Sequence, residues 1–169
     1  LEHHRAVAGG AQWGRIWLSS FSAGYGAVRE ILKDEEDFDR IAGILAADSI
    51  YASLDVSGDE RRPDANQMRD FRRFAKLAAQ GRRTSIVTQS DVETPYASTR
   101  ETADDLLRAV ELKRESVKSG EPDSLTLTSR ASRGRFYVLG YAGERGEDHL
   151  EHLRQIGQWW GVIHQDLNT

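Results

Sequence analysis

Residues 14–32 read GRIWLSSFSAGYGAVREIL, an apolar segment that leads through a serine into a helical pattern. Ser22 has a small residue two positions to either side, Ser20 before it and Gly24 after it. Small residues are needed there when a nucleophilic serine occupies a strained strand-to-helix turn, because the strand and the helix then pass close together. The segment therefore predicts a nucleophile elbow at Ser22, although Ser20 replaces the first glycine of the strict G-x-S-x-G pattern.

The rest of the chain alternates between apolar runs and helical patterns. Further strands are predicted at residues 41–47, 84–88 and 136–139, and helices at 23–33, 68–78, 98–110 and roughly 149–164. Gly81 is expected to stop the second helix, and residues 98–101 spell a capping box in front of the third. The acidic residues 34–37 are expected to form a solvated connection, and residues 125–128 a short edge strand.

Four strands that alternate with helices predict an α/β fold with three α/β/α layers around a mainly parallel sheet. The 169 residues suit one domain, 1–169. Residues 1–8 have the pattern of the tail of an amphipathic helix and lead straight into a buried strand, so we expect the domain to be incomplete at its N-terminus. The open sheet edge that this would leave favours a homo-oligomer, or a second fragment that completes the sheet.

The composition is that of an ordinary globular protein. The net charge of -4, from 23 basic and 27 acidic residues, disfavours nucleic acid as a partner. No apolar run is long enough for a membrane span, and residues 1–5 do not have the pattern expected of a signal peptide. The absence of cysteine excludes disulfides, thiolate metal sites and a cysteine nucleophile. A cytoplasmic location is slightly favoured.

Reactive side chains follow each predicted strand. Ser22 follows the first strand, Asp48 the second and Asp91 the third, while His149 comes shortly after the fourth. The carboxyl ends of parallel strands meet at one edge of a sheet, where functional groups gather. A serine hydroxyl becomes a good nucleophile when an imidazole accepts its proton, and a carboxylate then orients the imidazole. The order Ser, Asp, His therefore predicts a catalytic triad.

This order, on successive strand ends and with Ser22 in a small-x-Ser-x-Gly turn, resembles the α/β-hydrolase family over the whole chain. The resemblance implies that the four strands are the fifth to the eighth of that fold, without the strands that precede them. It also implies that the backbone amide of Ala23 is one donor of an oxyanion hole. Residues 21–25, 47–51 and 96–99 resemble segments of a group of bacterial α/β-hydrolases.

Two assignments stay open in the sequence. In the family the acid usually follows the seventh strand, the position of Asp91, and less often the sixth, the position of Asp48. We favour Asp48 slightly because it ends a wholly apolar strand, and keep Asp91 as the alternative. His152 and His164 compete with His149, which alone lies at the junction directly after the fourth strand.

The function expected from this resemblance is that of a serine hydrolase acting on a small acyl substrate, most readily a carboxylic ester. Phe21 and Tyr25 are expected to line the substrate pocket, and no metal or organic cofactor is implied. The alternative is a catalytically inactive α/β-hydrolase-like domain that serves as a binding or interaction module. The basic run formed by residues 61–62, Arg69, residues 72–73 and residues 82–83 is expected to form a solvated helix face.

Overall fold

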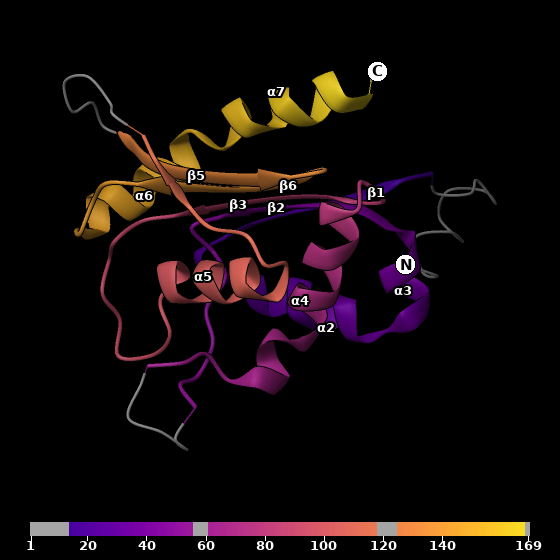
Figure 1. Ribbon diagram of the computed structural model, residues 1–169, viewed down its shortest axis with the longest axis horizontal. Coiled ribbons are helices and arrows are strands. Elements are labelled where there is room, and N and C mark those ends of the chain that lie inside the picture. Colours follow the sequence, from indigo (N-terminus) through magenta and orange to yellow (C-terminus); the bar gives the residue numbers. More distant parts are fainter. Residues whose placement is uncertain (1–13, 56–60, 118–124, 168–169) are drawn as a thin grey trace, which may run out of the picture.

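The computed structural model describes residues 14–55, 61–117 and 125–167. In these ranges six strands form one sheet in the order β1-β2-β3-β6-β5-β4 (Figure 1). The strands are β1 (Ile16–Phe21), β2 (Ile41–Ala47), β3 (Thr84–Gln89), β4 (Glu115–Ser116), β5 (Leu127–Arg133) and β6 (Phe136–Tyr141). Strands β1, β2, β3 and β6 are parallel, while β5 and β4 add an antiparallel edge. The predicted α/β class and the mainly parallel sheet are confirmed.

Helices lie on both faces of the sheet. They are η1 (Ser22–Gly24), α2 (Tyr25–Lys33), α3 (Glu35–Arg40), α4 (Ala65–Ala79), α5 (Thr99–Ala109), α6 (Gly146–Arg154) and α7 (Ile156–Leu167). Figure 1 shows α2, α4 and α5 below the sheet and α7 above it. The larger core lies under the sheet, and a smaller one forms where Trp159 packs near Leu45 and Ile86. No helix in the described ranges is long and apolar enough to cross a membrane.

Two helix ends form as their sequences predict. Gly81 adopts φ +77°, a left-handed conformation that glycine tolerates best, and its N–H donates to the carbonyl of Ala78 at 2.9 Å. At the start of α5 the Ser98 hydroxyl accepts from the Glu101 N–H, while the Glu101 carboxylate accepts from the Ser98 N–H. Both predictions are confirmed.

Three expectations about elements need correction. The acidic residues 34–37 are exposed or half-buried, but they are not a plain connection, because Asp34 caps α3 and accepts from the Asp37 N–H at 3.0 Å. The single helix expected near 149–164 is two helices, α6 and α7, which meet at Gln155. The edge strand expected at 125–128 extends to Arg133 and pairs with β6 as a hairpin. The helix tail expected at 1–8 lies outside the described residues.

Candidate active site

Ser22 lies where β1 ends and the helical segment of η1 and α2 begins. Its backbone has φ +52°, in the left-handed region that residues with a Cβ rarely adopt. Strain of this kind at a strand-to-helix turn is typical of a residue whose side chain must be held outward for function. Ser22 therefore has the backbone conformation that the predicted nucleophile elbow requires.

The small residues around Ser22 are in close contact. A Cβ atom added to Gly24 would lie 3.3 Å from the Cβ atom of Ser20, so the turn leaves little room for larger side chains. Ser20 is buried, and its Oγ lies 2.8 Å from the Oγ of Ser49. The Ser49 Oγ is also 3.0 Å from the carbonyl oxygen of Ser22. Ser20 can replace the usual glycine because its hydroxyl has a buried partner, and this contact helps to hold the turn.

Asp48 follows β2 and is completely buried. It also has a left-handed backbone, with φ +42°. Its N–H donates to the carbonyl oxygen and to the Oγ1 of Thr88, each at 3.1 Å, which ties this residue to the end of β3. The strained backbone of Asp48 is thus fixed by the neighbouring strand.

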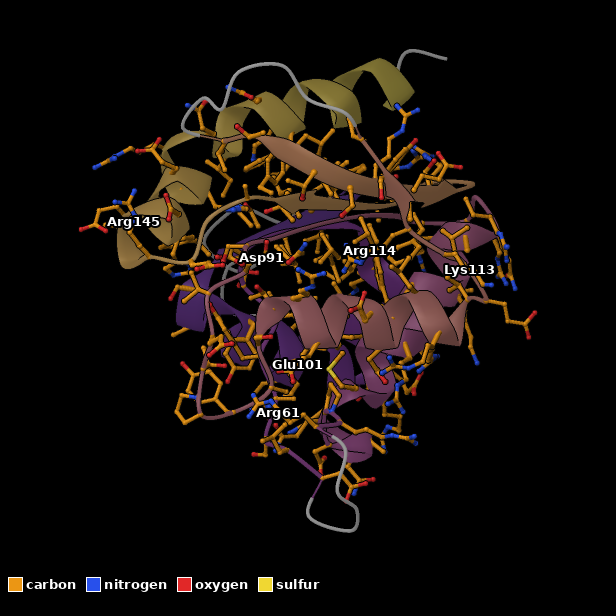
Figure 2. The ribbon with its side chains drawn as sticks, turned by 60° about the vertical axis from the view of Figure 1, so that its left-hand side comes forward. Arg61, Asp91, Glu101, Lys113, Arg114 and Arg145 are labelled. Atoms are coloured by element: carbon orange, nitrogen blue, oxygen red, sulfur yellow. The ribbon has the colours of Figure 1, made fainter. Side chains whose placement is uncertain are left out.

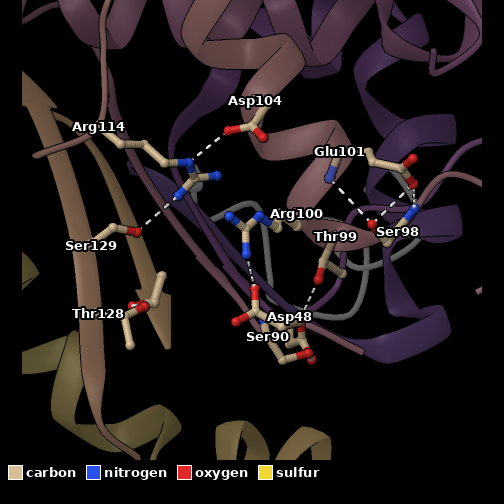
Figure 3. Close-up of polar contacts among 12 residues, drawn as sticks. Asp48, Ser90, Ser98, Thr99, Arg100, Glu101, Asp104, Arg114, Thr128 and Ser129 are labelled. Carbon is tan, nitrogen blue, oxygen red and sulfur yellow. Dashed lines mark hydrogen bonds and ion pairs between the residues drawn. The ribbon is translucent and has the colours of Figure 1, made fainter. Parts of the chain in front are cut away.

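The Asp48 carboxylate has four hydrogen-bond donors. Its Oδ1 accepts from the Ser90 N–H at 2.9 Å and from the hydroxyl of Thr99, which Figure 3 shows at the start of α5. Its Oδ2 lies 2.7 Å from the Ser90 hydroxyl and 2.7 Å from the Nδ1 atom of His149. Burial alone would raise the pKa of Asp48, but the His149 hydrogen bond and the other polar neighbours outweigh it and lower that pKa below its ordinary value.

His149 lies in the first turns of α6, with its ring stacked on Phe21 at a centroid distance of 4.5 Å and an angle of 26°. Because an ionised carboxylate only accepts hydrogen bonds, the Nδ1 atom of His149 carries a proton and donates a hydrogen bond to Asp48. The Nε2 atom of the neutral ring is then a base. Ser22 follows Phe21 directly, so the ring is next to the turn, although no hydrogen bond joins the Ser22 hydroxyl to His149 within the described residues.

Asp91, the alternative acid, has a different environment. Its carboxylate pairs with Arg100, and 27% of its side chain is exposed. Figure 2 shows it in the loop between β3 and α5, above Glu101 and Arg61, where these residues help to line a hollow of about 510 Å³. Of the two candidates, the structure brings Asp48 to His149 and directs Asp91 to Arg100.

His152, one turn after His149, is completely buried. Its Nδ1 atom is 2.7 Å from the Thr88 Oγ1, its ring stacks on Trp159, and its Nε2 atom has no hydrogen-bond partner. It thus supports the Asp48 region through Thr88, and the ring that contacts Asp48 is that of His149. The other competitor, His164, lies in α7, and its side chain is outside the described ones.

The burial of His152 predicts a loss of stability in acid. Burial lowers the pKa of His152 below its ordinary value of 6.5. At pH values between 6.5 and that lower pKa, the unfolded chain binds more protons than the folded protein. The free energy of unfolding therefore decreases as the pH is lowered through this range, by up to about 1.4 kcal/mol per pH unit. His152→Asn, which retains a polar group near Thr88, should flatten this slope in denaturant titrations at successive pH values. Equal slopes in the two proteins would contradict the prediction.

Three tyrosines form an aromatic row beside the site. The ring of Tyr51 meets the rings of Tyr25 and Tyr96 edge to face, at centroid distances of 5.5 and 5.4 Å. Burial raises the pKa of Tyr51, so its hydroxyl keeps its proton at neutral pH. Tyr25, expected to line the substrate pocket, belongs to this row, whereas the other expected lining residue, Phe21, faces His149.

The hydroxyls of Thr88, Ser90 and Thr99 were not anticipated as parts of the site. Thr99 lies in the capping-box segment, whose sequence predicts a helix start but gives no sign of a contact with Asp48. It comes near Asp48 because Ala52 and Ala97 form a β-bridge between the two loops. The clue to Ser90 was its place directly after β3, at the same sheet edge as Asp48.

Within the described ranges no group of three or more histidine or acidic side chains could hold a metal ion. No protein-family model, curated protein or solved structure matches this chain. The assignment of the site therefore depends on its geometry.

Proposed function

We propose that this protein is a serine hydrolase of the α/β-hydrolase type that cleaves a carboxylic ester through an acyl-enzyme on Ser22. The observation that carries the proposal is the hydrogen bond of 2.7 Å between the buried Asp48 carboxylate and the Nδ1 atom of His149, beside a half-buried serine with a left-handed backbone. In the proposal His149 is the oriented base and Ser22 is the nucleophile, the two parts that acyl transfer requires.

In the first half-reaction the Ser22 hydroxyl attacks the ester carbonyl carbon while the Nε2 atom of His149 takes its proton. This step requires a Ser22 rotamer that places the hydroxyl oxygen within hydrogen-bond distance of that nitrogen. The tetrahedral intermediate then expels the alcohol, which receives the proton from His149. In the second half-reaction water, deprotonated by His149, attacks the acyl-enzyme, and the carboxylic acid leaves as Ser22 regains its proton. Asp48 stays ionised and stabilises the imidazolium in both halves.

The oxyanion of the intermediate would be stabilised by the N–H of Ala23. This residue is exposed and follows Ser22 in η1, at the start of a helical segment that continues through α2. The first N–H groups of a helix have no acceptor within it, so they can donate to a bound oxyanion. The tyrosine row of Tyr25, Tyr51 and Tyr96 would contact the apolar part of the substrate.

The proposal is tested by hydrolysis of acetyl, butyryl and octanoyl p-nitrophenyl esters, with the matching anilides as amide substrates. We expect saturable release of p-nitrophenol from the esters and much slower cleavage of the anilides. Ester cleavage that does not exceed the protein-free rate, from a protein with a cooperative unfolding transition, would instead favour the inactive binding module.

A further inference from the structure

An arginine directly precedes each of the four parallel strands. Arg15 precedes β1, Arg40 precedes β2, Arg83 precedes β3 and Arg135 precedes β6. Neighbouring strands lie about 4.8 Å apart and parallel strands begin at the same edge, so these residues form a row along the amino end of the sheet. All four, together with Arg82, line one hollow of about 430 Å³, in which Asp39 is the only acidic lining residue among those described.

A second hollow, of about 700 Å³, adjoins the first and shares Asp39, Arg82 and Arg83 with it. Helix α4 contributes the further cations of this hollow, which are Arg69, Arg72, Arg73 and Lys76. We call the two hollows together the cationic basin. It gathers nine of the 23 lysines and arginines of a protein whose net charge is -4. Within the basic run, Arg69, Arg72 and Arg73 lie on one helix, α4, and line this concave surface together with Arg82 and Arg83.

Some of the basic side chains of the basin form ion pairs with neighbouring carboxylates. Five cations of the basin have acidic partners in the pairs Arg40–Glu36, Arg69–Asp70, Arg72–Asp105, Arg73–Glu35 and Arg83–Asp39. The Arg72 pair is bidentate, with both distances 2.7 Å. In contrast, Arg15, Lys76 and Arg82 are exposed and have no carboxylate partner in the described part of the chain. Their charges are available to a ligand, and Arg82 belongs to both hollows.

We propose that the cationic basin binds a small molecule that carries several phosphate groups. The guanidinium fork matches two phosphate oxygens, and each phosphate concentrates its negative charge in a small volume. The volumes of the hollows are in the range of small-molecule sites, and a concave surface suits a compact ligand better than a long, uniform nucleic-acid backbone. Cations without a carboxylate partner line both hollows, and Arg82 lies where the hollows meet. This arrangement favours a ligand with several phosphates, which can occupy both hollows at once.

The basin is separate from the candidate active site. It lies at the amino end of the parallel strands, whereas Ser22, Asp48 and His149 follow their carboxyl ends. Figure 1 shows α3, which ends at Arg40, and α6, which carries His149, at opposite ends of the sheet. Ligand binding in the basin therefore requires no triad residue, and it is an additional property of the protein.

The test is calorimetric titration of the full chain with inorganic triphosphate at neutral pH, at low and at moderate ionic strength. We expect one site per chain, weaker in salt. Arg82→Ser should raise the Kd about tenfold, because it removes a charged hydrogen-bond donor from both hollows. The matched control is Arg154→Ser, which removes an equally charged, exposed side chain from α6. Ser22→Ala should bind as the wild type does.

Several outcomes would overturn the proposal. Undetectable triphosphate binding at low ionic strength would exclude the site, as would equal losses in Arg82→Ser and Arg154→Ser. A DNA oligonucleotide that binds while triphosphate neither binds nor competes would show that the basin is a nucleic-acid surface instead. Thermal unfolding of each variant checks that these exposed substitutions leave the fold intact.

Discussion

Replacing Ser22 by alanine should lower kcat for ester hydrolysis by about 10⁶-fold, the loss typical of removing the nucleophile of a serine hydrolase. The change deletes the only atom that can form the acyl-enzyme, while the methyl side chain of the variant leaves the buried contacts of Asp48 and His149 in place. Alanine and serine both carry a Cβ atom, so the left-handed backbone at this turn strains them to a similar degree and the free energy of unfolding should change little. Initial rates with the butyryl ester measure the loss.

The matched control for this experiment is Ser19→Ala, which removes an exposed hydroxyl three residues earlier on β1. Its rate should equal that of the wild type. If Ser22→Ala retains the wild-type rate, Ser22 is not the nucleophile and the proposed mechanism fails.

Asp48→Asn should lower kcat by about 10⁴-fold, because the amide can donate a hydrogen bond to the Nδ1 atom of His149 and so favours the wrong tautomer of the ring. The Nε2 atom would then carry the proton and could not accept one from Ser22. The substitution is nearly isosteric, but the four groups around the Asp48 carboxylate all donate hydrogen bonds to it. The NH2 group of asparagine cannot accept from the donors that it would face. The free energy of unfolding should therefore also fall, by about 1–3 kcal/mol.

Asp91→Asn serves as the control for the choice between the two acids. It alters an ion pair with Arg100 at the surface, so kcat should stay within a fewfold of the wild-type value. Steady-state kinetics of both variants decide between the alternatives. A large loss in Asp91→Asn with little effect in Asp48→Asn would assign the acid to Asp91.

The sequence predicted the elements whose patterns are local. The apolar runs that became β2, β3 and β6 and the capping box of α5 are set by side chains close together in the chain. The division between α6 and α7 was missed because neither glycine nor proline marks it at Gln155. Helix α3 was missed because acidic residues suit both a solvated loop and the first turn of a helix, where the dipole favours them.

The residues that follow each strand could be predicted from the sequence, whereas contacts between residues far apart in the chain could not. Strand ends pointed to Ser22 and His149 as candidates, but both Asp48 and Asp91 follow predicted strands, and the wholly apolar strand before Asp48 gave only a slight preference for it. The choice depends on Thr99, which reaches Asp48 across 51 residues of sequence. The cationic basin was missed for the same reason, since arginines before separate strands become neighbours only in the folded sheet.

The most direct test of the account is the intact mass of the native protein after reaction with a fluorophosphonate, followed by peptide mapping. We expect one adduct per chain, located on Ser22 and lost in His149→Ala and in denatured protein. No adduct on the folded protein, or an adduct on another residue, would contradict the claim that Ser22 is an activated nucleophile.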